Sequence, residues 1–512
     1  MTRLGSCGAL LLAALLVSQS GAAGGVQGLR GTDGLLRAYD AILDARFDQV
    51  EAELHRACGA APPQACEVLR ATALWWRILH DPENRDLDAA FSGEIEKAIA
   101  ACDDWADREP DEAEAWFYLG AAYAARVQWR VLRDQKVAAA RDGKRIRDAL
   151  IEAIELDPAL EDAYFGLGLY KYYADVAPTA AKILRMLLFL PGGNREEGLR
   201  EMLRARDRGR LLQGEADYQL HIIYLWYERR TDRAVQLLRS LHDHYPANPL
   251  FPAQIAEIQD QYLHDINASL ATWRTLLAAA REQRVNLPGL AATRARLGIA
   301  RQLETLHQTD LAIEHLTEVV DSRSSAPFGS LALAHLRLGE AHDRLGLRAQ
   351  AVAAYQAALA TLPGRDPYGI RRQVGERMRR APDPRRAEAY RLALEAWRLL
   401  EHSDEAQAVA LFERSLALNG ADPVARYRYG RALQALHDDI RALAQFEQTI
   451  RAAKTCPAPV LGAAYLDAAR LHERSGRRGQ ALTYYRTAST LYGAAADTRA
   501  TAARALARLS PR

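Results

Sequence analysis

The sequence lacks an excess of charge of either sign. Its 67 lysines and arginines nearly balance 65 aspartates and glutamates, so that 512 residues carry a formal net charge of only +2. The chain therefore has no global positive field that would attract nucleic acid, and we expect no nucleic-acid partner. The sequence also lacks alternating apolar runs long enough for β-strands, which argues against a sheet.

Signatures of catalysis are missing as well. The chain has no glycine-rich loop for phosphate, no Gly-x-Ser-x-Gly and no His-Glu-x-x-His. His242 and His244 flank Asp243, a set that can hold a metal. Tyr245-Pro246 follows at the end of an expected helix, where histidines suit the helix dipole, and we favour this capping role. We therefore expect no enzyme activity, no cofactor and no metal.

What the sequence does contain is a helical composition and a spaced pattern of small and large residues. Hydrophobic residues make up 49% of the chain and charged residues 26%, as packed helices require. Small Gly339 allows a second helix to cross closely, Tyr355 fills the gap to the next unit, and Pro363 ends the helix. The full pattern is Leu338-Gly339, Ala351, Tyr355, Ala358 and Pro363.

The pattern recurs along the chain with a period near 34 residues. Ala408 and Phe412 return as Ala442 and Phe446, which is an offset of 34. An earlier copy opens at Trp116 but its closing residues arrive 14 positions late, which predicts two longer helices. Further copies contain Leu167-Gly168, Tyr218 with Ala234, Leu297-Gly298, and Tyr465 with Ala481 and Tyr485.

These residues resemble the tetratricopeptide-repeat family, whose units are helix-turn-helix hairpins. The clear motif matches run from about Asp111 to Tyr492, and looser helix-pair patterning begins near Gly34. The block from Ala38 to Gly193 also resembles the N-terminal region of exported bacterial repeat proteins that have no assigned function. The resemblance implies an all-α fold, a right-handed superhelical solenoid of stacked hairpins. The repeat length predicts roughly ten to twelve helix pairs.

The family binds its ligands on the concave wall formed by the first helix of each hairpin, which implies a protein or peptide partner here. For the aromatic residues near the N-terminus, packing between helices is an equal alternative. Arginine and tryptophan contribute the largest energies at interfaces, which favours the later positions. At the corresponding positions of the repeats in this sequence, the candidates are Phe117, Phe165, Tyr172, Glu340, Arg344, Trp397, Tyr427 and Arg431.

The N-terminus has the pattern of an export signal. Arg3 precedes the apolar stretch Leu10 to Val17, and small residues at 20–23 suit a cleavage site. Cys7 precedes the apolar stretch, so that lipidation at Cys7 is rejected. The stretch is shorter than the ~20 residues of a membrane-spanning helix. We expect a cleaved signal and a bacterial periplasmic or secreted protein, with an uncleaved anchor as the alternative.

The cysteines are interpreted in that setting. Cys58 and Cys66 flank a turn rich in glycine and proline, and in an oxidising compartment we expect them to form a disulfide. The alternative is two ordinary buried thiols. Cys102 and Cys456 lie far apart in the sequence, and we expect both to be buried free thiols.

Two segments depart from the repeat pattern. Residues 364–386 hold eight arginines and three prolines, which indicates a solvated basic linker or, alternatively, a patch for an acidic partner. Residues 183–190 are apolar on nearly every face, which predicts a buried helix or, alternatively, a partner-docking or membrane-surface contact.

The expected division of the chain follows from these segments. It is a signal peptide at 1–23, an enlarged N-terminal repeat region at 30–265, central repeats at 266–363, the basic linker at 364–386 and C-terminal repeats at 387–512. We expect an exported, non-enzymatic scaffold that binds its partner in a concave groove, in a role such as envelope assembly. The alternative is a membrane-associated envelope factor attached through 183–190 or through an uncleaved N-terminus.

Overall fold

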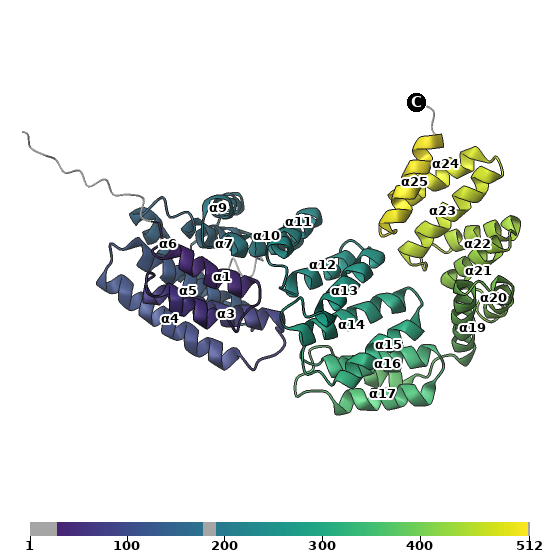
Figure 1. Ribbon diagram of the computed structural model, residues 1–512, viewed down its shortest axis with the longest axis horizontal. Helices are drawn as coiled ribbons and strands as arrows, with labels where there is room; N and C mark the ends of the chain where they lie inside the picture. The colour runs from purple at the N-terminus through teal and green to yellow at the C-terminus, as the bar shows by residue number, and fades with distance from the viewer. Residues whose placement is uncertain (1–27, 178–190, 510–512) are drawn as a thin grey trace, which may run out of the picture.

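The computed structural model describes residues 28–177 and 191–509. This part of the chain contains 24 helices and no strand, which confirms the expected all-α array of stacked hairpins. Twenty-two of these helices form eleven antiparallel pairs, within the expected range, and Figure 1 shows their succession along the chain. The apolar segment 183–190 and the export signal lie outside the described residues.

The N-terminal pairs are α1 (Thr32–Leu43) with α2 (Val50–Ala57), α3 (Pro63–His80) with α4 (Asp88–Arg108), α5 (Ala113–Leu132) with α6 (Lys136–Leu156), α7 (Ala163–Val176) with α9 (Arg195–Arg208), and α10 (Gln213–Trp226) with α11 (Thr231–His244). The helices α5 and α6 have 20 and 21 residues, which confirms the stretched repeat.

The central pairs are α12 (Leu250–Gln261) with α13 (Ile266–Arg281), α14 (Pro288–Thr305) with α15 (Thr309–Ser322), and α16 (Ser330–Arg344) with α17 (Arg348–Ala360). The C-terminal pairs are α19 (Pro384–Glu401) with α20 (Glu405–Leu418), α21 (Pro423–Ala435) with α22 (Asp439–Arg451), and α23 (Ala458–Arg474) with α24 (Arg478–Thr490). The unpaired helices are α18 (Ile370–Arg379) and the terminal α25 (Ala496–Leu509).

The repeat pattern requires glycine because an aromatic ring occupies the space that a Cβ atom would take. A Cβ atom added to Gly339 would lie 2.3 Å from the ring of Tyr355, and Gly430 has the same relation to Phe446 at 2.6 Å. Tyr355 is fully buried, and its hydroxyl donates to Asp343 at 2.9 Å. The repeat therefore fixes how closely the two helices of a hairpin approach.

The first helix of each pair forms the inner wall of the array. In the central and C-terminal repeats, α12, α14, α16, α19, α21 and α23 each pack against the next helix of this series, which ends at α25, as well as against their own partners. The second helices lie on the outside. This arrangement gives the late repeats a continuous concave surface built from first helices.

The segment 364–386, expected as a linker, contains the helix α18. Ile370 and Val374, one turn apart, are buried against Leu336 and Tyr355, so that α18 continues the core of the preceding hairpin. Its arginines are partly engaged: Arg377 pairs with Glu340 at 3.0 Å, and Arg365 pairs with Glu83 at 2.8 Å. This segment joins the central repeats to the C-terminal arm and to the α3–α4 loop.

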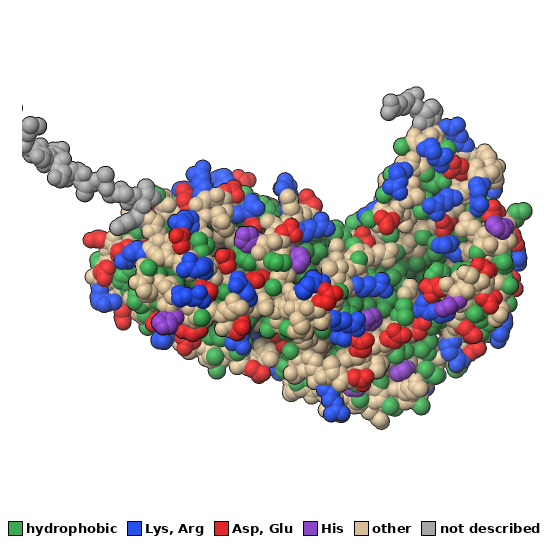
Figure 2. Space-filling view, viewed as in Figure 1, with side chains coloured by type: hydrophobic (Ala, Val, Ile, Leu, Met, Phe, Trp, Pro, Cys, Tyr) green, Lys and Arg blue, Asp and Glu red, His purple; other side chains and the backbone are tan. Residues whose placement is uncertain are grey.

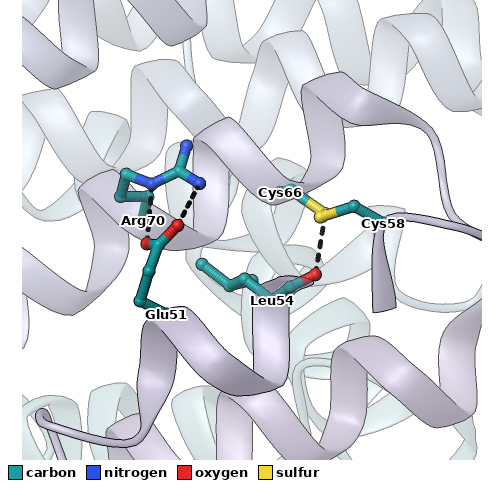
Figure 3. The surroundings of a disulfide bond; sticks show 5 residues. All are labelled: Glu51, Leu54, Cys58, Cys66 and Arg70. Carbon is teal, nitrogen blue, oxygen red and sulfur yellow. Dashed lines mark hydrogen bonds and ion pairs between the residues drawn. A yellow bond between two sulfur atoms is a disulfide. The ribbon is translucent and has the colours of Figure 1, made fainter. Parts of the chain in front are cut away.

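Cys58 and Cys66 are joined by a disulfide, with their Cα atoms 6.2 Å apart (Figure 3). The bond connects the end of α2 to the first turn of α3, next to the ion pair between Glu51 and Arg70. Cys102 and Cys456 are buried and free. Burial raises the pKa of the Cys102 thiol to about 12, which keeps it protonated and unreactive.

The C-terminal arm curves back until it touches the middle of the chain (Figure 1). The hydroxyl of Tyr492, after α24, donates to the carbonyl oxygen of Tyr262, after α12. The rings of Tyr492 and His264 meet edge to face, with centroids 5.5 Å apart. Arg499 lies 3.8 Å from Asp265. These contacts join the C-terminal end of the array, near α25, to the loop that follows α12.

Candidate functional site

The concave wall of the late repeats carries two of the expected partner-binding residues in direct contact. Arg431, which is exposed on α21, donates to the hydroxyl of Tyr427 at 3.3 Å. Tyr427 donates in turn to Asp467 of α23 at 3.1 Å, and Arg470 pairs with Asp467 at 3.0 Å. Burial raises the pKa of Tyr427, so that its hydroxyl remains a donor. Arg431 makes no ion pair within the described chain.

A second cluster lies where α21 and α19 meet the α14–α15 turn. Arg428 is 5% exposed and donates to the carbonyl oxygens of Leu306 at 2.9 Å and His307 at 3.1 Å. Its guanidinium lies 4.6 Å from the ring centre of Trp397, which is close enough for a cation–π contact. Burial lowers the pKa of Arg428 to about 10, and it stays charged at neutral pH. Arg428 thus connects α21 to the α14–α15 turn.

Trp397 and Arg344 belong to this second cluster. The indole nitrogen of Trp397 is buried and has no hydrogen-bond partner. Arg344 pairs with Glu304 at 3.1 Å and lies 5.6 Å from the ring centre of Tyr390. The structure therefore places four of the five late candidates in two adjacent clusters that share α21, and the fifth, Glu340, pairs with Arg377 of α18. Figure 2 shows the hollow between the C-terminal arm and the middle of the chain, with basic side chains along that arm.

The three early candidates lie elsewhere and are buried, which supports the packing alternative for Phe117 and Phe165 and corrects the groove position expected for Tyr172. Phe117 is 1% exposed, Phe165 4% and Tyr172 0%. Phe117 and Phe165 line an internal cavity, and the hydroxyl of Tyr172 donates to Glu228. The physical reason is that Phe117 belongs to the large N-terminal hydrophobic core, and Phe165 and Tyr172 belong to a second core between α7, α9 and α10.

Sequence reasoning missed Arg428, Tyr390 and Asp467 as members of these clusters. Arg428 was passed over because an arginine is usually solvated, whereas this one is buried among aromatic rings. The available signal was its place in the run Arg426-Tyr427-Arg428-Tyr429, where a helix must bury some rings and bring the arginine with them.

Among the described residues, no group of three or more histidine, cysteine, aspartate or glutamate side chains gathers in a way that would hold a metal. His242 and His244 lie in the last turn of α11. Within residues 28–177 and 191–509, none of the helices has the length and apolar character to cross a membrane.

Comparison with known proteins gives remote similarities. No family model matches the sequence, and no curated protein matches it. Three solved structures illustrate the matches. The complex of the TPR2AB domain of yeast Sti1 with pHSP90 is 14% identical over 58% of this chain and 96% of that chain, with a TM-score of 0.22.

A tetratricopeptide-repeat protein from Parabacteroides merdae is 12% identical over 58% of this chain and 98% of that one, with a TM-score of 0.25. The human IFIT1 dimer with PPP-AAAA is 13% identical over 83% and 94%, with a TM-score of 0.32. At this level of similarity, the fold assignment stands on the helix pairing and repeat residues of the chain itself.

Proposed function

We propose that this chain, a tetratricopeptide-repeat protein by its fold, is an exported, non-enzymatic scaffold that holds a protein or peptide partner against the concave wall of its late repeats. The observation that carries the proposal is the exposed guanidinium of Arg431 on that wall, fixed by Tyr427 and without a carboxylate partner in the described chain. Arginine beside aromatic rings is the composition that dominates binding energy at protein interfaces.

The shape of the late repeats supports an extended ligand. The wall runs through α14, α16, α19, α21 and α23, and the contacts of Tyr492 and Arg499 hold its ends together. Internal bracing by Arg428 reduces the ordering cost of binding, since the wall is already in place before a partner arrives.

Export is supported by two independent features. The disulfide between Cys58 and Cys66 is a bond that persists in oxidising compartments such as the periplasm. The N-terminal pattern of a basic residue, an apolar stretch and small residues is that of a signal peptide. We propose the envelope as the place of action and the assembly of envelope components as the role.

The groove assignment can be tested by capturing a partner from envelope extract and measuring its affinity for variants of the chain. Arg431→Ala and Trp397→Ala should each weaken binding by about tenfold or more, because removing an interface arginine or tryptophan typically costs 1–2 kcal/mol or more. The matched control is Arg414→Ala, which removes an exposed arginine from α20 on the outer layer. If both groove variants bind as tightly as the control, the groove assignment is wrong.

A further inference from the structure

The N-terminal region encloses a cavity of about 60 Å³ between α1, α3, α5, α7 and α10. Most of its wall is apolar, and five aromatic side chains contribute to it. The aromatic residues are Tyr39, Trp75, Phe117, Tyr118 and Phe165. Ala121, Ala124 and Gln128, which line one side, are partly exposed and give the cavity a route to solvent.

One wall of this cavity holds a carboxylate without a counter-ion. Glu215 of α10 is 5% exposed. It accepts hydrogen bonds from the Tyr39 hydroxyl at 3.0 Å, the Trp76 indole nitrogen at 3.1 Å and the Gln219 amide at 3.3 Å. These donors are neutral, and no lysine, arginine or histidine of the described chain forms an ion pair with Glu215. Burial raises the pKa of Glu215, because its ionised form has no counter-ion there, and a bound cation would supply one.

The other carboxylate at the cavity has its reason within the fold. Asp162 accepts hydrogen bonds from three successive backbone amides, those of Arg210, Leu211 and Leu212, at 2.8–3.0 Å. It thereby fixes the chain entering α10. Glu215 instead accepts from side chains of α1 and α3, and all of its donors are neutral.

The remaining polar atoms of the wall favour a ligand that donates hydrogen bonds. The hydroxyl oxygen of Tyr118 is buried and has no hydrogen-bond partner in the described chain. Together with the Glu215 carboxylate it presents acceptors to the cavity, and the aromatic faces attract positive charge. An anion would meet repulsion from Glu215 and Asp162, and a neutral hydrocarbon would leave the carboxylate uncompensated.

We propose that this cavity binds a small alkylammonium ion, with Glu215 as its counter-ion and the aromatic side chains as its walls. The volume has room for roughly two to four water-sized groups, which corresponds to ions such as methylammonium, ethylammonium or trimethylammonium. A ligand with only three non-hydrogen atoms binds weakly, which sets the dissociation constant of ethylammonium at about 0.5 mM at best.

Isothermal titration calorimetry of the full chain tests the proposal with ethylammonium chloride, and with ethanol and potassium chloride as the neutral and inorganic probes. Ethylammonium should give a saturable, one-site titration, and the two other probes should not. Ethanol has the same number of non-hydrogen atoms, so that the comparison isolates the charge. Equal binding of ethanol would show an apolar cavity, and saturable binding of potassium alone would show a metal-ion site; either result overturns the proposal.

Two variants locate the binding. Glu215→Gln keeps the shape of the side chain and should weaken ethylammonium at least tenfold, whereas Glu152→Gln, on the exposed face of α6, should leave it unchanged. Ala124→Leu adds three carbon atoms at the cavity wall and should also abolish binding while leaving the carboxylate in place. Circular dichroism checks that each variant is folded. Unchanged affinity in a folded Glu215→Gln or Ala124→Leu variant would refute the site.

Discussion

Replacing Gly168 by valine should destabilise the chain by about 3 kcal/mol, because the helices α7 and α9 touch there through their backbones. A Cβ atom added at Gly168 would lie 2.6 Å from the carbonyl oxygen of Gly198 and 2.9 Å from the backbone nitrogen of Met202. Backbone atoms cannot rotate away as a side chain does, so that the two helices must separate and lose packing. The midpoint of urea unfolding measures the loss.

The control for this prediction is Gly93→Ala in α4. A Cβ atom at Gly93 would meet nothing within 4 Å, and alanine should stabilise the helix by about 0.5–1 kcal/mol. Hydrogen exchange locates the effect: the amides of α7 and α9 should lose protection in Gly168→Val but keep it in Gly93→Ala. Equal stability of the two variants would show that α7 and α9 do not approach as described.

Removing His80 should make the protein less sensitive to acid. His80 is 1% exposed, and both of its ring nitrogens lack hydrogen-bond partners in the described chain. Burial, followed by the nearby charge of Arg294, lowers its pKa from 6.5 to about 3. The unfolded chain therefore binds a proton that the folded chain refuses, and the stability due to neutral His80 is lost as pH falls from 6.5 towards 3.

The magnitude follows from the gap in pKa. At pH 4.5 the unfolded histidine is two pH units below its pKa, which corresponds to about 2.7 kcal/mol. The free energy of unfolding of His80→Phe, relative to that of the original chain, should therefore improve by about this amount between pH 7.5 and pH 4.5. Urea titrations at both pH values provide the difference, and the pH 7.5 pair is the control. A relative stability that does not change with pH would mean that His80 is solvated.

The repeat architecture was predictable because it depends on local spacing. The relation of Gly339 to Tyr355 is set within one hairpin, so that the residues alone indicate where the helices cross. The place of Phe117 was not predictable in the same way. Its phase puts it on the first helix of a hairpin, but only the packing of α5 against α3 and α7 shows that this side chain is buried.

Two further features depend on contacts between distant parts of the chain. Glu215 meets Tyr39 and Trp76 across 176 and 139 residues, and no local pattern signals such a meeting. The segment around α18 is rich in proline and arginine, and its only apolar stripe is Ile370 and Val374. Two residues are too few to predict a helix before the surface that they pack against is known.

We propose that the concave wall of the late repeats holds the partner. The most direct test is photo-crosslinking in cells, with a benzoyl-phenylalanine at position 431 on the inner wall or at position 440 on the outer layer, where Ile440 is 87% exposed. We expect a discrete crosslinked product from position 431 and none from position 440. The same product from position 440, with none from position 431, would contradict the proposal.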